Sequence, residues 1–162
     1  DGTRIVAVVK ADGYGHGAEA ISRLIEDYEY IWGFATATAE EAIQLKDAGI
    51  EKPVLILGLV FEEYFQELIR KDVRLTVCEY NVAKILSDEA VRQGRQVHIH
   101  IALDTGMSRI GYQVTEEAAV LDLQISRKAL RRSKRSLHFQ MLRLKVCLHT
   151  SRGQMRRIKL RQ

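Results

Sequence analysis

The first 105 residues repeat one pattern, in which a short apolar, β-branched run is followed by a stretch whose apolar residues recur at helical spacing. The apolar runs predict strands at 5–11, 31–37, 53–58, 74–79 and 96–105. The stretches between them predict helices at 18–27, 39–48, 62–70 and 81–93. Alternating units of this kind predict an α/β fold with parallel strands and right-handed crossovers.

Helix ends support this division of the chain. Thr38, followed by Glu40 and Glu41, is typical of a helix start with a threonine cap and acids in the first turn. Gly49 and Gly94 follow two predicted helices, where a left-handed cap favours glycine. The sheet has two possible closures, a doubly wound sheet or a (β/α)8 barrel, and periodicity alone does not choose between them. Five strands would make just over half a barrel.

The charge distribution changes abruptly near residue 124. Residues 1–124 contain 12 Lys+Arg and 21 Asp+Glu, a net charge of −9, whereas residues 125–162 contain 13 Lys+Arg and no acid, a net charge of +13. The whole-chain net charge of +4 and pI of about 9.1 therefore describe neither part. The pI is not evidence for nucleic-acid binding.

Three interpretations of residues 125–162 stay open. The first is a basic solvated helix or a disordered tail, and the second is an arm that binds nucleic acid. The third is an altered reading frame, because adenine-rich Glu and Lys codons read one base out become Arg and Lys codons. A shifted back-translation of residues 135–143 can encode the strand-and-loop sequence that a barrel would have next.

Length and composition bound the function. The 162 residues, 46% of them hydrophobic, fit one soluble globular domain with a sizeable core. Cys78 and Cys147 lie far apart and predict neither a disulfide framework nor a zinc site, so we expect a cytoplasmic protein. No apolar run is long enough for a bilayer, and we expect no membrane association.

The sequence motif most specific to a chemical function runs from Val8 to Gly17, with Lys10 at the carboxyl end of an apolar strand and a glycine-rich turn after it. In a parallel barrel this end is the catalytic face. A lysine in a partly desolvated mouth has a lowered pKa and reacts with an aldehyde cofactor. A strand-end lysine that extends to solvent is the alternative interpretation.

The string K-A-D-G-Y-G-H-G resembles the pyridoxal-phosphate lysine motif of alanine racemases, whereas related enzymes on the same barrel share only its first residues. The resemblance implies that Lys10 is the Schiff-base lysine and one of two catalytic bases. It also implies that Tyr14 lines the phosphate side of pyridoxal 5'-phosphate. His16 belongs to the motif, but we expect a helix-start histidine bonded to the backbone.

A second string, D-T-G-M-S-R-I-G from Asp104 to Gly111, is similar to another motif of this family. The resemblance implies that Arg109 hydrogen-bonds the phenolic oxygen of the cofactor. We expect Gly106 and Gly111 to serve the backbone and Asp104 to orient the loop. One departure is Ala102, because many family members have a lysine there, often carbamylated, that positions the arginine.

The resemblance covers residues 4–123 and implies a (β/α)8 TIM-barrel type, here truncated to roughly the first five strands. The chain then divides into a partial cofactor-binding domain, 1–124, and a basic segment of uncertain structure, 125–162, for which a shifted reading frame is one of the open interpretations. The implied activity is racemisation of L-alanine to D-alanine for peptidoglycan synthesis, by a homodimer with shared active sites. The second base is a tyrosine from the partner subunit, so we expect these 162 residues alone to be inactive and marginally folded.

Two other functions stay in view. One is a pyridoxal-phosphate-binding relative that is not a racemase, against which the complete string ending Tyr-Gly-His-Gly argues. The other is a basic interaction module, although no aromatic or glycine-rich pattern accompanies its charges and we expect no nucleic-acid partner. His98 and His100 share a strand face, but two histidines without a third ligand predict polar strand positions and no metal site.

Overall fold

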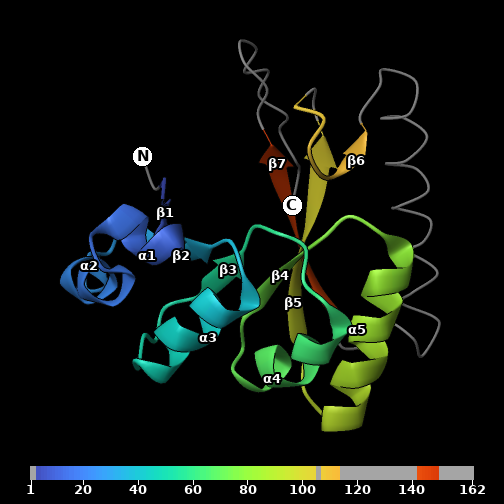
Figure 1. The fold of residues 1–162 in the computed structure, drawn as a ribbon. Helices are drawn as coiled ribbons and strands as arrows, with labels where there is room; N and C mark the ends of the chain where they lie inside the picture. The colour runs from blue at the N-terminus through green and yellow to red at the C-terminus, as the bar shows by residue number, and fades with distance from the viewer. Residues whose placement is uncertain (1–2, 105–106, 114–141, 150–162) are drawn as a thin grey trace.

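The computed structural model describes residues 3–104, 107–113 and 142–149, which form an α/β fold around one parallel sheet (Figure 1). The strands follow chain order, β1-β2-β3-β4-β5-β6, and β7 also pairs with β5. Neighbours in chain order are typical of a barrel wall, whereas a doubly wound sheet reverses its order at a switch point. The expected α/β fold of barrel type is confirmed.

The five expected strands and four expected helices all form. The strands are β1 Ile5–Val8, β2 Ile31–Thr36, β3 Val54–Ile56, β4 Arg74–Val77, β5 Val97–Asp104, β6 Tyr112–Gln113 and β7 Leu142–His149. The helices are α1 Lys10–Gly15, α2 Ala18–Ile25, α3 Ala39–Asp47, α4 Phe65–Arg70 and α5 Tyr80–Gln93, with a 3-10 turn η1 at Glu62–Tyr64. The first strand is shorter than the expected 5–11, because the backbone turns after Val8 into α1.

One face of the sheet carries the hydrophobic core. The parallel registers place Ile56, Leu75 and Ile99 in one row across β3, β4 and β5. These side chains are buried together with Leu68 of α4 and Leu86 of α5, both fully inaccessible to solvent. The alternation of strand side chains thus sends every second residue toward the helices that cover this face.

The opposite face is more polar. Thr76 pairs with His100 in the register, and both are buried. The guanidinium carbon of Arg74 lies 4.8 Å from the centre of the Trp32 ring, which in turn lies 6.0 Å from the His100 ring. Burial lowers the pKa of Arg74, and the nearby Asp72 carboxylate opposes that shift. This face therefore holds a layer of polar and aromatic side chains where a barrel has its interior.

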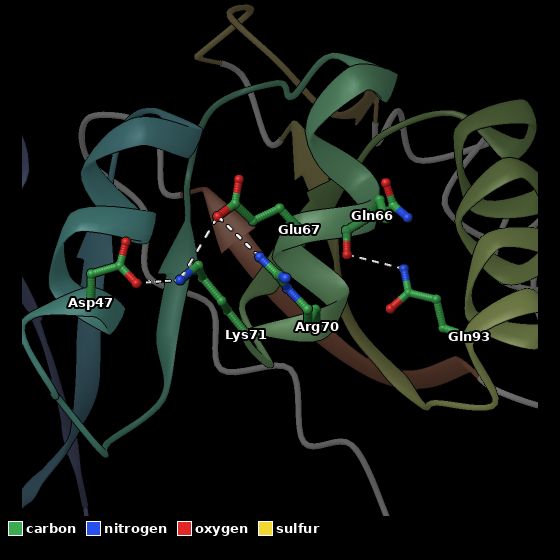
Figure 2. Close-up of polar contacts among 6 residues, drawn as sticks. All are labelled: Asp47, Gln66, Glu67, Arg70, Lys71 and Gln93. Carbon is green, nitrogen blue, oxygen red and sulfur yellow. Dashed lines mark hydrogen bonds and ion pairs between the residues drawn. The ribbon is translucent and has the colours of Figure 1, made fainter.

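Polar contacts join the helices of the outer layer (Figure 2). The Lys71 ammonium, at the end of α4, forms an ion pair with Asp47 of α3 and a longer one, 3.8 Å, with Glu67. From α5, the Gln93 side chain donates to the Gln66 carbonyl oxygen at 3.0 Å. These contacts join α3 to α4 and α4 to α5.

In the described part of the chain no helix is long and apolar enough for a bilayer.

Helix caps follow the sequence signals. Thr38 forms a capping box with Glu41 at the start of α3, as the threonine cap and first-turn acids predict. Gly94 ends α5 in the left-handed region, with φ of 62°, and Gly49 follows α3 with φ of 86°. Both glycine predictions are confirmed.

The strand β7 lies in the segment for which the sequence predicted no defined element. It runs parallel to β5 in register from Val97 opposite Leu142 to Asp104 opposite His149. It therefore occupies the place of a next strand beside β5. The other residues of 125–162 lie outside the described part, so the division at residue 124 stays a prediction.

Candidate functional site

The residue singled out by the first motif, Lys10, lies directly beyond the carboxyl end of β1. The strand's hydrogen bonding continues to Val9, whose N–H donates to the Ala35 carbonyl at 2.8 Å. Residues 11–14 then take left-handed dihedrals, with φ between 50° and 63°. Three of these four residues are not glycine, and left-handed backbone costs such residues about 1–2 kcal/mol each. The lysine therefore sits at the start of a strained turn that other contacts must hold.

One set of contacts holds this turn against α2. The Asp12 side chain accepts a hydrogen bond from the Ala18 N–H at 2.9 Å, and its carbonyl accepts one from Gly17 at 2.9 Å. Gly13 is buried, and a Cβ there would lie 3.1 Å from the Ile21 Cδ1 atom. Tight packing therefore favours glycine at this position, and glycine also takes its left-handed dihedral without the cost that other residues have.

A second set of contacts holds the turn against α3, through Glu41. Its Oε1 atom accepts from the Ala11 N–H at 2.8 Å, and its Oε2 atom accepts from the Ala37 N–H at 2.8 Å. The same carboxylate forms the capping box with Thr38. The sequence predicts Glu41 as a first-turn acid, but a capping pattern carries no information about a contact thirty residues away. The link to the lysine turn was missed.

Tyr14 is the site residue that the structure brings close to Lys10. The Lys10 Nζ atom lies 6.0 Å from the centre of the Tyr14 ring, at the outer limit of a cation–π contact. The tyrosine is 59% exposed, so its hydroxyl is accessible to a ligand. An amine and a phenol thus lie side by side at the open end of β1.

The second motif lies beyond the carboxyl end of β5. Asp104 is buried, and its Oδ1 atom accepts from the Ser108 N–H at 2.9 Å. Ser108 is left-handed, with φ of 55°. At Gly111 a Cβ would lie 2.8 Å from the Asp104 N atom, so only glycine fits this close approach. Asp104 and Gly111 therefore order the loop as expected, whereas Gly106 lies outside the described residues.

The loop presents Arg109 at the surface, exposed to solvent. Lys10 and Arg109 both follow the carboxyl ends of parallel strands and so lie at the same edge of the sheet. Three strands separate them, because β2, β3 and β4 lie between β1 and β5. In the described residues no hydrogen bond, ion pair or ring contact joins the two side chains. The two residues therefore lie at the same edge of the sheet but do not contact each other.

Two residues near the Arg109 loop, Ala102 and Cys78, contribute no charge to it. Ala102, at the position of the family's lysine, is fully buried and supplies no charge toward Arg109. Cys78 follows β4, and burial raises the pKa of its thiol above the usual 9.0. The Glu79 charge raises that pKa further, and the Gly111 backbone opposes the shift. The thiol therefore stays neutral at physiological pH and is a poor nucleophile.

The three histidines whose side chains the structure describes, His16, His98 and His100, have partners within the fold. The His16 ring and the Gly13 carbonyl oxygen lie within hydrogen-bond distance, 3.2 Å, as expected for a helix-start histidine. His98 pairs with Asp72 at 3.1 Å, and His100 lies beside Trp32. Among the described residues no group of three or more potential ligands could hold a metal ion.

The fold and the site define a class of protein: a parallel β/α domain with a lysine beyond its first strand and an arginine loop beyond its fifth. The sequence profile described as "Alanine racemase, N-terminal domain" matches residues 1–159. The chain belongs to the alanine racemase family and corresponds to the N-terminal part of its members.

Individual relatives agree with this assignment. The chain is 43% identical to the alanine racemase of Clostridium perfringens strain SM101 over 122 residues, which cover 75% of this chain and 31% of that protein. It is 38% identical to alanine racemase 1 of Caldanaerobacter subterraneus over 109 residues, 67% of this chain and 28% of that protein. The matched region thus spans only 28% and 31% of the length of these two curated relatives.

Solved structures show the same fold. An alanine racemase from Clostridium difficile 630 superposes with a TM-score of 0.77 at 29% identity, covering 92% of this chain and 36% of that one. The enzyme from E. faecalis superposes with a TM-score of 0.72 at 32% identity, covering 94% and 38%. The expected family resemblance is confirmed.

Proposed function

We propose that this chain carries the lysine side of the cofactor site of an alanine racemase, which interconverts L-alanine and D-alanine in the cytoplasm for peptidoglycan synthesis. The proposed cofactor is pyridoxal 5'-phosphate. Lys10 is the proposed cofactor-binding lysine and one of the two catalytic bases. Tyr14 and Arg109 are the proposed residues that bind its phosphate side and phenolic oxygen.

The observation that carries this proposal is the placement of the two family motifs. The string that contains Lys10 follows β1, the string that contains Arg109 follows β5, and both strands end at the same edge of the sheet. In parallel barrels this edge is where catalytic groups collect. The family assignment and the motif positions therefore support the same end of the sheet as the reaction site.

The side chains present suit this cofactor. An amine is the group that binds an aldehyde, and Lys10 offers one beyond a strand end, only partly buried. The Tyr14 hydroxyl and the Arg109 guanidinium are exposed donors suited to anionic oxygens. The family's groups for the pyridine nitrogen, the main phosphate loop and the second base belong to a later part of its longer chains.

When bound, pyridoxal phosphate would supply an electron sink, which weakens the bond between the α-carbon and its hydrogen. The Lys10 Nζ atom then takes the α-proton, or returns one, on its own face of the substrate. Arg109 would hold the phenolic oxygen and stabilise its negative charge, and the buried Ala102 offers Arg109 no charge partner. Inversion needs a second base on the opposite face, which the family draws from a partner subunit in a homodimer.

Absorbance spectroscopy with added pyridoxal phosphate tests the cofactor site directly. We expect a new band from lysine-bound cofactor in the wild-type chain and its loss in Lys10→Ala, because the amine is the attachment point. Lys84→Ala is the matched control, since Lys84 is an exposed lysine on α5, far along the chain from the motif. An equal band in Lys10→Ala would contradict the proposed function.

A further inference from the structure

Glu41 connects the lysine turn to the next strand–helix unit. Its Oε1 atom accepts from the Ala11 N–H and its Oε2 atom from the Ala37 N–H, both at 2.8 Å, and Oε2 also accepts a longer bond, 3.4 Å, from the Thr38 N–H. Ala11 directly follows Lys10, and Ala37 directly follows the last residue of β2. A single side chain therefore bridges the segments that follow two neighbouring strands, β1 and β2.

The Glu41 bridge begins where the backbone hydrogen bonding between β1 and β2 ends. The pairing of β1 with β2 runs to Val8 opposite Ala35, and the last backbone bond joins the Val9 N–H to the Ala35 carbonyl. Beyond this point the chain turns left-handed, so the Ala11 N–H has no carbonyl of β2 to bond with. The carboxylate of Glu41 takes the place of that missing acceptor.

The location favours a charged acceptor. Glu41 lies in the first turn of α3, where the helix dipole stabilises negative charge. Hydrogen bonds to an ionised acceptor are stronger than neutral ones. The turn that it holds contains three left-handed residues other than glycine, so its geometry depends on such external contacts.

We propose that Glu41 is a positioning residue for Lys10: it fixes the lysine turn to β2 and α3 and so aims the amine at its ligand. The inference rests on the proposed function of Lys10. Glu41 acts through the backbone and touches neither the ligand nor the reacting atoms. Its loss should change how Lys10 meets the cofactor more than it changes the fold.

Two neighbouring residues supply matched controls. Glu40 carries the same charge in the same helical turn but hydrogen-bonds the Tyr64 hydroxyl. Thr38→Ala removes the side-chain cap of α3, an effect of similar size on the helix, and leaves the contact with Ala11 in place. Glu41→Gln is compared with Glu40→Gln and Thr38→Ala, each first checked for folding by circular dichroism.

The first measurement follows amide hydrogen exchange at Ala11. We expect Glu41→Gln to speed exchange there about tenfold, because one charge-assisted acceptor is lost or weakened. Glu40→Gln and Thr38→Ala should leave the Ala11 rate near that of the wild type. Unchanged exchange in Glu41→Gln would overturn the inference, since the contact would then not hold the turn.

The second measurement adds pyridoxal phosphate, traps it on lysines with borohydride, and maps the labelled sites by mass spectrometry. We expect the wild type to favour Lys10 over exposed lysines, Glu41→Gln to lose about tenfold of this preference, and both controls to keep it. If the preference persists in Glu41→Gln, the positioning role is wrong while the proposed function stands. If the wild type shows no preference, the proposed function fails, and the inference fails with it.

Discussion

At the residue scale, the sequence predicted the motif residues but not the contacts that hold them. The run from Lys10 to Gly17 identified the chemistry, because its residue types and order are specific. It could not show that residues 11–14 are left-handed, since alanine, aspartate and tyrosine there normally favour other dihedrals. The sequence also could not predict the hydrogen bond between Glu41 and the Ala11 N–H, because these residues are thirty positions apart.

Gly13 and Gly15 allow the packing of this turn to be separated from its dihedrals. Both are left-handed, but a Cβ at Gly13 would press on Ile21 at 3.1 Å, whereas at Gly15 it would meet nothing within 4 Å. We expect Gly15→Ala to lower the free energy of unfolding by about 1 kcal/mol and Gly13→Ala by about 2–3 kcal/mol. Urea denaturation followed by circular dichroism measures both. Equal losses would show that packing at Gly13 contributes nothing.

At the element scale, hydrophobic periodicity predicted the five strands and four helices because β2 to β5 bury rows of apolar side chains against the helices. It predicted β1 too long, since the expected strand continued to residue 11 whereas the backbone turns into α1 at Lys10. It missed β7, in which Arg143, Lys145, Cys147 and His149 alternate with apolar residues inside a strongly basic segment. In this segment the many basic residues hid the alternation of apolar positions that is typical of a strand.

Lys46 stabilises the connection between α3 and β3. Its Nζ atom donates to the carbonyl oxygens of Ile50, Glu51 and Lys52, at 3.1, 3.3 and 3.0 Å. Lys46→Met keeps the apolar stem and removes these donors, so we expect a loss of about 1–2 kcal/mol in the free energy of unfolding. Lys84→Met, on the exposed face of α5, is the control and should change stability by less than about 0.5 kcal/mol. Thermal unfolding of the two variants makes the comparison, and similar midpoints would refute the role of Lys46.

At the scale of the whole molecule, strand order decided what periodicity had left open. Neighbours in chain order from β1 to β6 favour the barrel wall over the doubly wound sheet. The same order places the two motifs at one end of the sheet with three strands between them. The origin of the basic segment is a separate question, and sequencing the coding DNA tests the altered reading frame. A coding sequence whose shifted frame has no coherent continuation would exclude that interpretation.

The strand β1 is the edge of the described sheet, because its pairing there is with β2 alone. Its side chains Ile5 and Val8 are 50% and 41% exposed, and an apolar edge of this kind promotes pairing between chains. We expect the chain to self-associate with rising concentration, and Ile5→Lys to reduce this association by placing a charge on the edge. Leu24→Lys is the matched control, since Leu24 is 74% exposed on α2 and equally apolar but lies off the sheet. Sedimentation velocity over a concentration series measures the effect. An equal reduction in both variants would show that general surface apolarity, and not the edge of β1, drives the association.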